Sequence, residues 1–403
     1  MKNKWQKKPL GDLCEVFADG DWVESKDQSP EGVRLIQTGN VGDGVFKDRA
    51  EKARYISEKT FKRLRCTEIF KGDCLISRLP DPAGRSCILP DTRERMITAV
   101  DCTIIRFHQR RVIPEFFNYY TQSYDYLKDV DSKTTGATRK RISRSNLGDI
   151  LIPSPPLPEQ QRIVGILDDV FSNIATAKAN AEKNLQNARA LFESHLDAVF
   201  TKRGKGWVEK RLEELGTITS SKRIFKSEYV TSGVPFYRTK EIKELANGQE
   251  ITTELFISEA RYKEIKANFG VPKQGDILLT AIGTIGEIYV VEGDDDFYFK
   301  DGNVLWLKEF TTINPQFLKY VLVSFVESLN KIAHGSAYSA LPIQRLNAHK
   351  IFVPSPAEQA MIVSQLNSLN EETKRLESIY QQKLAALEAL KKSLLNQAFT
   401  GKL

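Results

Sequence analysis

An internal repeat is the feature that most constrains how this chain can fold, because segments of its first half return about 201 residues later. Residues 71–75 return as residues 274–278, with Gly-Asp and leucine at matching places. The Pro-Ser-Pro of residues 153–155 returns at residues 354–356, and the offset varies only between 199 and 203. One duplicated unit accounts for this pattern. We therefore predict two globular units with internal near-two-fold symmetry, an arrangement that suits a target with two parts.

The composition is that of a soluble globular protein with room for two or three domains. The chain has 403 residues, of which 41% are hydrophobic and 28% are charged, so apolar surface suffices for real cores. It has no run of about 18 apolar residues, and no apolar segment follows the basic residues 1–10, so we expect neither a membrane span nor a secretory signal. The net charge of +7 is compatible with nucleic acid as a partner but does not identify one.

Each repeat has the same three-part plan, with a globular part, a proline-rich hinge and a long helix. Apolar runs that follow a glycine, at residues 73–76 and 276–279, are typical of strands, and Pro114 and Pro315 favour short helices. We predict an α+β fold, in which two pseudo-symmetric globular α/β domains are separated by two long antiparallel helices that form a coiled coil. The predicted boundaries are 1–152 and 205–353 for the globular domains, and 153–204 and 354–403 for the helical segments.

The long helices are predicted from apolar positions that recur at spacings of three and four. In the first repeat these positions are Ile163, Leu167, Val170, Ile174, Ala177, Ala181, Leu185, Ala188 and Leu191. In the second repeat they are Ile362, Leu366, Leu369, Thr373, Leu376, Tyr380, Leu384, Leu387 and Leu390, with identical steps. This pattern is typical of a coiled-coil seam, and antiparallel pairing would bring the C-terminus near the N-terminus. The alternative, that each helix covers its own core, is disfavoured because a helix of roughly 60 Å outreaches a domain of about 150 residues.

No catalytic or metal-binding motif is present in the sequence. Neither a Gly-x-Gly-x-x-Gly turn nor a phosphate-binding loop occurs, and the four histidines lie far apart. All five cysteines fall in the first repeat without a Cys-x-x-Cys pair, so we expect free thiols in a reducing cytoplasm. We therefore predict a non-catalytic protein that binds no metal.

A basic segment of the first repeat is the clearest candidate surface for nucleic acid. Residues 133–144 combine a glycine turn with hydroxyl groups and cationic side chains, which are common partners of phosphate. Arginine also reads guanine, whereas glutamine and asparagine suit adenine. The candidate residues of this repeat are Lys133, Thr135, Thr138, Arg139, Lys140, Arg141 and Arg144, together with Gln37, Asn40 and Arg78. The alternative is a solvated loop with ordinary surface charges.

The corresponding segment of the second repeat, residues 334–345, keeps the glycine and hydroxyl groups but loses most of the charge. Further basic clusters lie at residues 220–226 and 236–240. The candidate residues of this repeat are Lys222, Arg223, Tyr237, Arg238, Ser336, Tyr338, Ser339, Gln344 and Arg345. Two domains that recognise different nucleic-acid sequences are expected to share a backbone frame and to differ in its side chains. A structural role is the alternative for the two basic clusters.

The order of these features resembles the specificity (S) subunit of Type I restriction-modification enzymes. The resemblance rests on residues 150–164, which run from Ile-Leu-Ile-Pro-Ser-Pro to Glu-Gln-Gln-Arg-Ile-Val, and on residues 350–359 of the second repeat. The helix ends, Ala-Val-Phe-Thr and Gln-Ala-Phe-Thr, carry it as well, so it covers the full chain. The second hinge is two residues shorter and has Met361 where the first has Arg162, so helix entry is expected to differ there.

The resemblance implies two target-recognition domains that read the two halves of an asymmetric, bipartite site in double-stranded DNA. It also implies that the helices set the spacing and dock two modification (M) subunits, with restriction (R) subunits in the full complex. Those partners would hold S-adenosylmethionine, Mg and ATP, and methylation of an extruded adenine would be their task. This chain itself would bind no cofactor and would act in the prokaryotic cytoplasm.

Two other functions are weighed against this one. A coiled-coil scaffold that binds only proteins would have no affinity for DNA, and no reason for its two loops to differ in charge. An enzyme that acts on DNA by itself, such as a fused methyltransferase or nuclease, would need a cofactor or metal motif, and none occurs in the sequence. We therefore predict a DNA-recognition subunit without catalytic activity.

Overall fold

The computed structural model describes residues 5–108, 110–136, 139–202, 204–332 and 340–403, without the side chains of 327–332. The chain divides into two compact units. The first unit comprises Met1–Glu182 and Gln381–Leu403, and the second comprises Lys183–Tyr380. Within the described residues, no helix is both long enough and apolar enough to cross a membrane.

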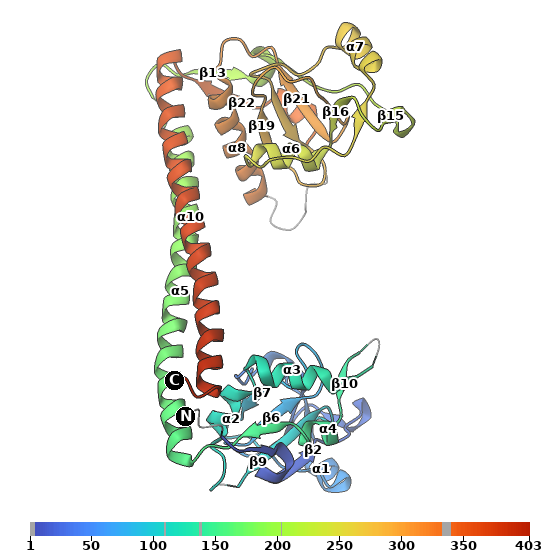
Figure 1. Ribbon diagram of the computed structural model, residues 1–403. Helices are drawn as coiled ribbons and strands as arrows, with labels where there is room; N and C mark the ends of the chain where they lie inside the picture. Colours follow the sequence, from blue (N-terminus) through green and yellow to red (C-terminus); the bar gives the residue numbers. More distant parts are fainter. Residues whose placement is uncertain (1–4, 109, 137–138, 203, 333–339) are drawn as a thin grey trace. The chain divides into compact units, whose positions relative to one another are not determined.

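The first unit contains two four-stranded sheets and several short helices (Figure 1). The central sheet has the strand order β2 (Cys14–Asp19), β9 (Cys102–Phe107), β6 (Cys74–Ser77) and β7 (Ser86–Ile88). The outer sheet has the order β3 (Gln28–Ser29), β5 (Tyr55–Ile56), β4 (Val33–Ile36) and β8 (Met96–Thr98), with β4 and β8 parallel. The remaining elements are the pair β1 (Lys7–Pro9) and β12 (Leu151–Pro153), the hairpin β10 (Thr134–Thr135) and β11 (Arg141–Ile142), and the helices α1 (Glu58–Leu64), α2 (Pro114–Tyr120), α3 (Tyr124–Ser132) and α4 (Arg144–Gly148).

Strand β6 lies at the centre of the first unit because its side chains alternate between two apolar faces. Cys74 and Ile76 pack on one face with Phe117 of α2. Leu75 packs on the other face with Ile36 of the outer sheet. The unit is therefore layered as helices, central sheet and outer sheet, and each layer buries apolar surface of the next.

The second unit repeats this topology strand by strand (Figure 1). Its central sheet has the order β14 (Thr217–Ser220), β21 (Val304–Lys308), β18 (Ile277–Thr280) and β19 (Ile288–Val290). Its outer sheet has the order β15 (Tyr229–Val230), β17 (Phe256–Ile257), β16 (Val234–Tyr237) and β20 (Tyr298–Phe299), with β16 and β20 parallel. The remaining elements are the pair β13 (Val208–Arg211) and β22 (Lys350–Val353), and the helices α6 (Thr239–Ala246), α7 (Glu259–Asn268), α8 (Pro315–Ile332) and α9 (Ile343–Asn347).

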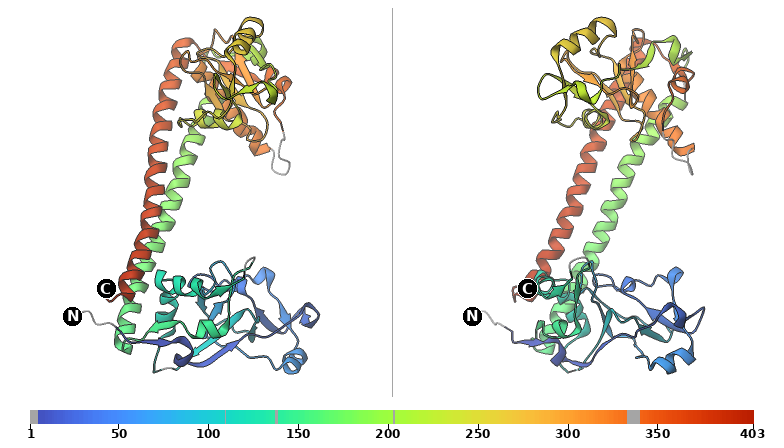
Figure 2. Two further views of the ribbon diagram at one scale, coloured as in Figure 1. Left: turned by 45° about the vertical axis from the view of Figure 1, so that its right-hand side comes forward. Right: turned by 90° about the vertical axis from the view of Figure 1, so that its right-hand side faces the viewer.

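Two long helices, α5 (Leu157–Thr201) and α10 (Pro356–Phe399), each belong to both units, and they run antiparallel (Figure 2). In the first unit, Lys178 of α5 pairs with Glu388 of α10 at 2.6 Å. In the second unit, Arg189 pairs with Glu377 at 3.3 Å. The α+β fold class with two pseudo-symmetric domains and an antiparallel helix pair is therefore confirmed.

The predicted seam is buried or half-buried at all but its last position in each helix. Leu191 and Leu390, the exceptions, are 56% and 45% exposed. Their neighbours Leu196 and Leu395 are buried instead, because each helix end leaves the seam and packs against a globular core. At the chain end, Leu403 packs in the same apolar cluster as Trp5, so the two chain ends come together within the first unit.

A buried glutamine closes the hinge before each long helix. Gln160 accepts a hydrogen bond from the backbone amide of Ile113 at 2.8 Å and donates to the carbonyls of Arg111 and Pro155 at 3.0 and 2.9 Å. Gln359 repeats this arrangement, accepting from the amide of Asn314 and donating to the carbonyl of Pro354. The glutamine of the repeated hinge motif is thus explained by polar backbone groups that only an amide can satisfy together.

The five cysteines of the first unit are thiols, and burial raises the pKa of each. For Cys102 burial raises the pKa to about 11, so thiolate would be about a thousandth of this group at pH 8. We expect the native protein to react with iodoacetamide at least about 100-fold more slowly than in guanidinium chloride, where all five thiols are exposed. Intact mass measured over time checks this, and rapid labelling of the native protein would contradict it.

Candidate nucleic-acid interface

The base of the β10–β11 hairpin is held in a backbone frame that both units share. In the first unit, the amide of Ile142 donates to the carbonyl of Arg78 at 3.2 Å, and the amide of Arg78 donates to the carbonyl of Asp101 at 2.9 Å. In the second unit, Leu341 donates to Ala281 at 2.9 Å, and Ala281 donates to Asn303 at 2.8 Å. These bonds make Arg78 equivalent to Ala281 and Asp101 equivalent to Asn303.

This frame corrects one alignment that the sequence suggested. Alignment of residues 133–144 with residues 334–345 pairs Ile142 with Ile343. The hydrogen bonds instead pair Ile142 with Leu341. Both Ile142 and Leu341 are buried, whereas Ile343 is only half-buried and begins α9. The register is therefore set by which residue fills the core beside the hairpin, and the shift also makes Ala340 the equivalent of Arg141.

In the first unit this frame carries a charged cluster, made of Asp19, Arg78, Asp101, Arg141 and Arg144. A guanidinium nitrogen of Arg141 lies 2.9 Å from a carboxylate oxygen of Asp101. Arg78 and Arg144 lie 3.2 and 3.8 Å from the two oxygens of Asp19. The side chains of Arg141 and Arg144 are nearly half exposed, so the cluster reaches the surface.

In the second unit the equivalent positions carry no charge. The register of the central sheets makes Ser220 equivalent to Asp19. Ala281, Asn303, Ala340 and Ile343 take the places of the other four residues. One backbone frame thus presents ionic groups in one unit and small, polar or apolar groups in the other.

Arg78 was predicted to contact DNA, and the structure corrects this. Only 4% of Arg78 is exposed, and its guanidinium donates to the carbonyl of Val100 at 2.5 Å. Burial lowers the pKa of Arg78, although Asp19 beside it opposes that shift. Within the described residues its Nε has no hydrogen-bond partner. Arg78 therefore lies beneath the exposed cluster and supports Asp19 rather than facing a ligand.

Two lysines of the basic loop interact with oxygen atoms of the first unit itself. Lys133 donates to the carbonyl of Asp149 at 3.0 Å, and Lys140 pairs with Asp131 at 2.8 Å. Thr135 and Arg139 are exposed, whereas Thr138 lies outside the described residues. Gly136 has φ of +106°, and a Cβ there would meet the Arg139 carbonyl at 2.4 Å, so the turn requires glycine.

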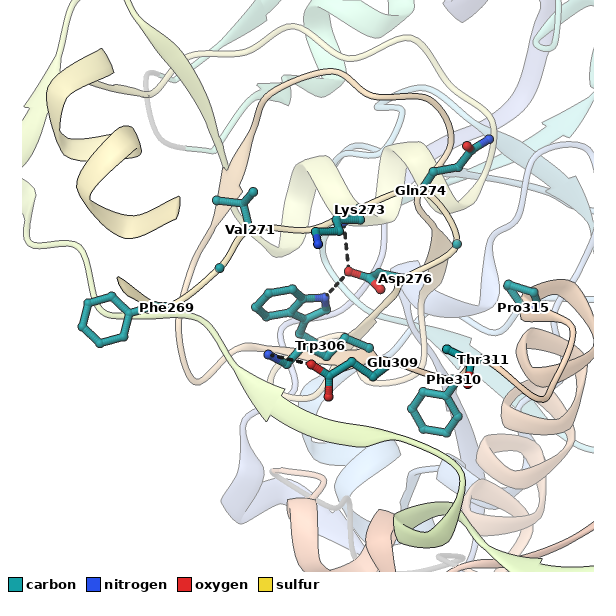
Figure 3. Close-up of a pocket in the computed structure, with 13 residues that line it drawn as sticks. Phe269, Val271, Lys273, Gln274, Asp276, Trp306, Glu309, Phe310, Thr311 and Pro315 are labelled. Carbon is teal, nitrogen blue, oxygen red and sulfur yellow. Dashed lines mark hydrogen bonds and ion pairs between the residues drawn. The ribbon is translucent and has the colours of Figure 1, made fainter. Parts of the chain in front are cut away.

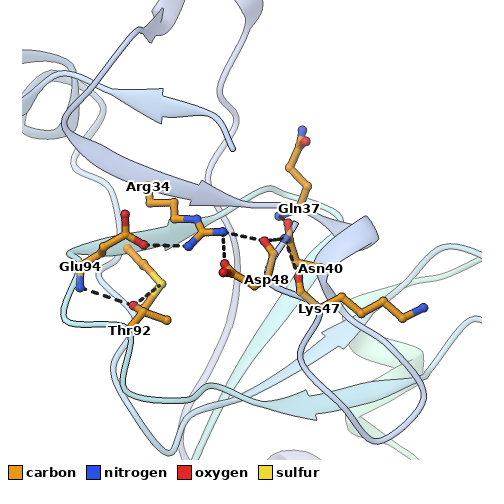
Figure 4. Close-up of polar contacts among 8 residues, drawn as sticks. Arg34, Gln37, Asn40, Lys47, Asp48, Thr92 and Glu94 are labelled. Atoms are coloured by element: carbon orange, nitrogen blue, oxygen red, sulfur yellow. Dashed lines mark hydrogen bonds and ion pairs between the residues drawn. The ribbon is translucent and has the colours of Figure 1, made fainter. Parts of the chain in front are cut away.

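Of the two predicted amides, Gln37 and Asn40, only Gln37 has a side chain that extends away from the turn (Figure 4). The oxygen of Asn40 accepts from the Gln37 amide at 2.9 Å, and its nitrogen donates to the carbonyls of Lys47 and Asp48 at 2.9 and 3.0 Å. Arg34 holds the same turn through Asp48 and Glu94. Asn40 therefore has a structural role in this turn, and its DNA contact stays a prediction.

In the second unit, Arg238 is also structural. Its guanidinium pairs with the buried Glu241 at 2.6 Å and with Glu254 at 2.9 Å, and these bonds raise the pKa of the arginine. Glu241 also accepts a hydrogen bond from the Arg238 backbone amide at 2.7 Å, at the start of α6. Tyr237 is half-buried and stacks on Phe297 with centroids 4.8 Å apart. These residues therefore fix α6, and the DNA contact predicted for Arg238 stays a prediction.

Four of the remaining predicted residues of the second unit lie at its surface. The ammonium of Lys222 lies 4.9 Å from the ring of Phe269, beside a cavity of about 270 Å³ that Ser220 also lines. Arg223 pairs with Asp301 at 2.8 Å. Gln344 and Arg345 are exposed on α9. Ser336, Tyr338 and Ser339 lie outside the described residues.

A larger cavity of about 510 Å³ lies in the second unit between the end of α7 and the end of β21 (Figure 3). Asp276 accepts hydrogen bonds there from the indole of Trp306 at 2.8 Å and from the Lys273 amide at 2.9 Å. The ammonium of Lys308 lies 4.8 Å from the Trp306 ring centroid and 3.7 Å from Glu309. Two lysines and two carboxylates balance here, so the cavity favours neither an anion nor a cation.

Sequence reasoning missed the acidic members of the charged cluster and two exposed aromatic residues. Trp22 follows β2 and is 69% exposed, and Phe225 occupies a similar place after β14 with 61% exposed. Exposed aromatic rings are a common partner of bases, but nothing in their sequence context separates them from core residues. Asp19 and Asp101 are distant from the basic loop in sequence, so only the fold reveals their association with it.

Comparison with known proteins identifies the family. The model of the Type I restriction modification DNA specificity domain matches the chain twice, at residues 2–186 and 204–388. The chain belongs to this family. It is a Type I specificity subunit with two target-recognition domains, and it is not the catalytic component of the system. Below, the domain of the first repeat is called the first target-recognition domain, and that of the second repeat the second.

Individual relatives agree with this assignment. The Type I restriction enzyme EcoBI specificity subunit of Escherichia coli is 25% identical over 316 residues, which are 71% of this chain and 65% of that protein. A solved structure from work on assembly and conformational transition of the type I R-M system has a TM-score of 0.80 at 19% identity, covering 100% of this chain and 99% of that chain. The HsdS subunit from Thermoanaerobacter tengcongensis has a TM-score of 0.62 at 19% identity, covering 100% and 98%. At this identity the structures support the fold alone.

Proposed function

We propose that this subunit recognises a bipartite site in double-stranded DNA, with each target-recognition domain reading one half. The observation that carries the proposal is the shared frame at the hairpin base, which bears charged residues in the first domain and uncharged residues in the second. A fixed frame with variable side chains is suited to reading two different sequences by one docking geometry. Cations around the frame, such as Lys140, would contact phosphates and position the DNA.

The proposal extends to partners, which would be two modification subunits and, in the full complex, restriction subunits. Side chains of α5 and α10 that point away from the seam are exposed and mostly polar, such as Lys183, Asn187 and Glu371. Such a surface is available for docking without disturbing the seam. We further propose that S-adenosylmethionine, Mg and ATP are bound by those subunits, since methylation and cleavage are the reactions that need them.

The function is tested by mapping methylated bases in cells that express the cognate modification subunit with and without this chain. We expect a chain-dependent bipartite motif with N6-methyladenine in each half. Replacing Arg139 and Arg144 by alanine should change only one half of the motif, and replacing Lys222 and Gln344 should change only the other. Each lost bidentate base contact would cost about 1–3 kcal/mol in binding.

Two outcomes would contradict the proposal. If the modification subunit is active and bound but no chain-dependent motif appears, the scaffold without DNA binding becomes the better description. If variants in one domain alter both halves equally, the assignment of one half to each domain is wrong. Binding of the modification subunit, measured by co-purification, is the control that separates loss of recognition from loss of assembly.

A further inference from the structure

The pairing of Arg141 with Asp101 is unusual for a surface that faces a polyanion. Both side chains are accessible, with 45% of Arg141 and 30% of Asp101 exposed. A carboxylate at a DNA interface is repelled by phosphates, so it is unfavourable there unless it accepts a hydrogen bond from a base. The exocyclic amino groups of cytosine and adenine are the donors that bases offer in the major groove.

The backbone around this pair is tied to neighbouring strands by hydrogen bonds. Arg141 lies in β11, where it is in register with Thr135 of β10, and Ile142 beside it is hydrogen-bonded to Arg78 at the end of β6. Asp101 is tied to the same residue by the amide of Arg78. Arg78 at the end of β6 therefore holds the backbone at both partners. The two side chains can bind a ligand without a further loss of backbone conformational entropy.

The buried Arg78 lies beneath the acidic side of this pair. Only 4% of Arg78 is exposed, and its Nε is without a hydrogen-bond partner among the described residues. Its positive charge acts on Asp101 and on Asp19 from below. A carboxylate oxygen accepts hydrogen bonds, as reading of an amino group requires.

We propose that Arg141 and Asp101 together read one G·C base pair in the half-site of the first target-recognition domain. Arg141 donates to O6 and N7 of guanine, and Asp101 accepts from the N4 amino group of the paired cytosine. This inference rests on the proposed function and names the base pair that one part of the site selects.

The pattern of donors and acceptors favours G·C over A·T at this position. A G·C pair presents two adjacent acceptors on guanine and then a donor on cytosine, in the order in which an arginine and a carboxylate side by side can satisfy them. An A·T pair places its donor between two acceptors, so the guanidinium loses its bidentate contact. Within the described part of the chain, Arg141 makes no other ion pair or side-chain hydrogen bond, so donors remain for the base.

The second domain supplies an internal comparison. Asn303 and Ala340 stand where Asp101 and Arg141 stand in the first domain. These residues cannot form an ion pair or reproduce the bidentate contact. The preference for G·C from this pair should therefore be restricted to the half-site of the first domain.

The test uses this chain assembled with its modification subunits and duplexes in which each base pair of the bipartite site is changed in turn. Binding is measured by fluorescence anisotropy at two salt concentrations. For the wild type, we expect one G·C pair in one half-site whose replacement weakens binding by about 5- to 150-fold. Arg141→Ala and Asp101→Ala should each remove this discrimination at that position and leave the other positions unchanged.

Two further variants separate base reading from charge. Arg141→Lys keeps the cation but loses the planar fork, so it should keep the salt dependence and still lose the discrimination. Lys140→Ala removes an exposed cation of the same hairpin, which pairs with Asp131 of α3, so it should weaken binding to all sequences about equally and keep the discrimination.

Other results would overturn the inference in distinguishable ways. If Arg141→Ala weakens every sequence equally and lowers the salt dependence, Arg141 contacts phosphate. If the wild type discriminates a bipartite site but both variants keep the full pattern, the inference fails and the proposed function stands. If the wild-type complex has no sequence preference at all, the proposed function itself fails.

Discussion

Replacement of Phe399 by alanine is expected to destabilise the first target-recognition domain, although this residue lies near the C-terminal end of the chain. The ring packs edge-to-face on Phe116 and Tyr120, with centroids 5.3 and 5.1 Å away. Because Phe399 is partly buried in the core of the first unit, its loss removes about 2–4 kcal/mol from the stability of that unit. The effect follows from the antiparallel return of α10 to the unit in which the chain begins.

Hydrogen exchange measured by mass spectrometry resolves this effect by domain, which a single melting curve of a two-unit chain cannot do. Peptides of β6 and β9 should exchange faster in Phe399→Ala, while peptides of β18 and β21 keep the wild-type rate. Phe200→Ala is the matched variant, since Phe200 packs on Phe317 at 5.7 Å in the second unit, and it should show the reverse pattern. Leu390→Ala removes an exposed residue of the same helix and should change neither domain. Equal acceleration of both domains in Phe399→Ala would contradict the prediction.

The fold could be predicted from the sequence where the signal repeats. Spacings of three and four give the two long helices, and the duplicated motifs give the symmetry of the units. The predicted seam is wrong at Leu191 and Leu390, which continue the spacing but are exposed. Near these positions each helix end packs against the core of a globular unit and no longer against the other helix. The parallel pairing of β4 with β8 joins segments about 60 residues apart, and no local pattern encodes such a pairing.

The candidate site could be predicted in its location but not in its details. Cationic side chains in a glycine-bearing loop identify the β10–β11 hairpin, yet whether a cation is free for DNA depends on acids placed by tertiary structure. Arg78 is buried beside Asp19, 59 residues earlier in the sequence, so burial overrides a composition-based interpretation. Arg238 is different, because Glu241 three residues later is a local signal that a helix begins, and its carboxylate accepts from the Arg238 backbone amide.

Gln160→Leu is the second substitution for which we expect a large effect. The leucine is nearly the same size, but it leaves the amide of Ile113 and the carbonyls of Arg111 and Pro155 without partners in a buried site. A buried donor without a partner costs about 1–3 kcal/mol, and the two carbonyls add to this, so the first target-recognition domain should lose about 3–5 kcal/mol. Gln161→Leu, at the exposed neighbouring position of α5, should be nearly neutral. Gln359→Leu should produce the same loss in the second domain.

Gln160→Glu separates the loss of hydrogen bonds from a change of volume. The carboxylate keeps an acceptor for the Ile113 amide but turns its other oxygen toward two carbonyls, and burial also opposes its charge, so its pKa should be raised in the folded state. A raised pKa means that the folded state binds the proton more tightly, so the variant should be least destabilised below pH about 4 and should lose stability as pH rises through the folded-state pKa. Denaturant unfolding followed by hydrogen exchange at pH 4, 6 and 8 measures this. A pH-independent loss, or a variant more stable at pH 8 than at pH 4 relative to wild type, would show that the buried amide is not satisfied in the way the hinge geometry implies.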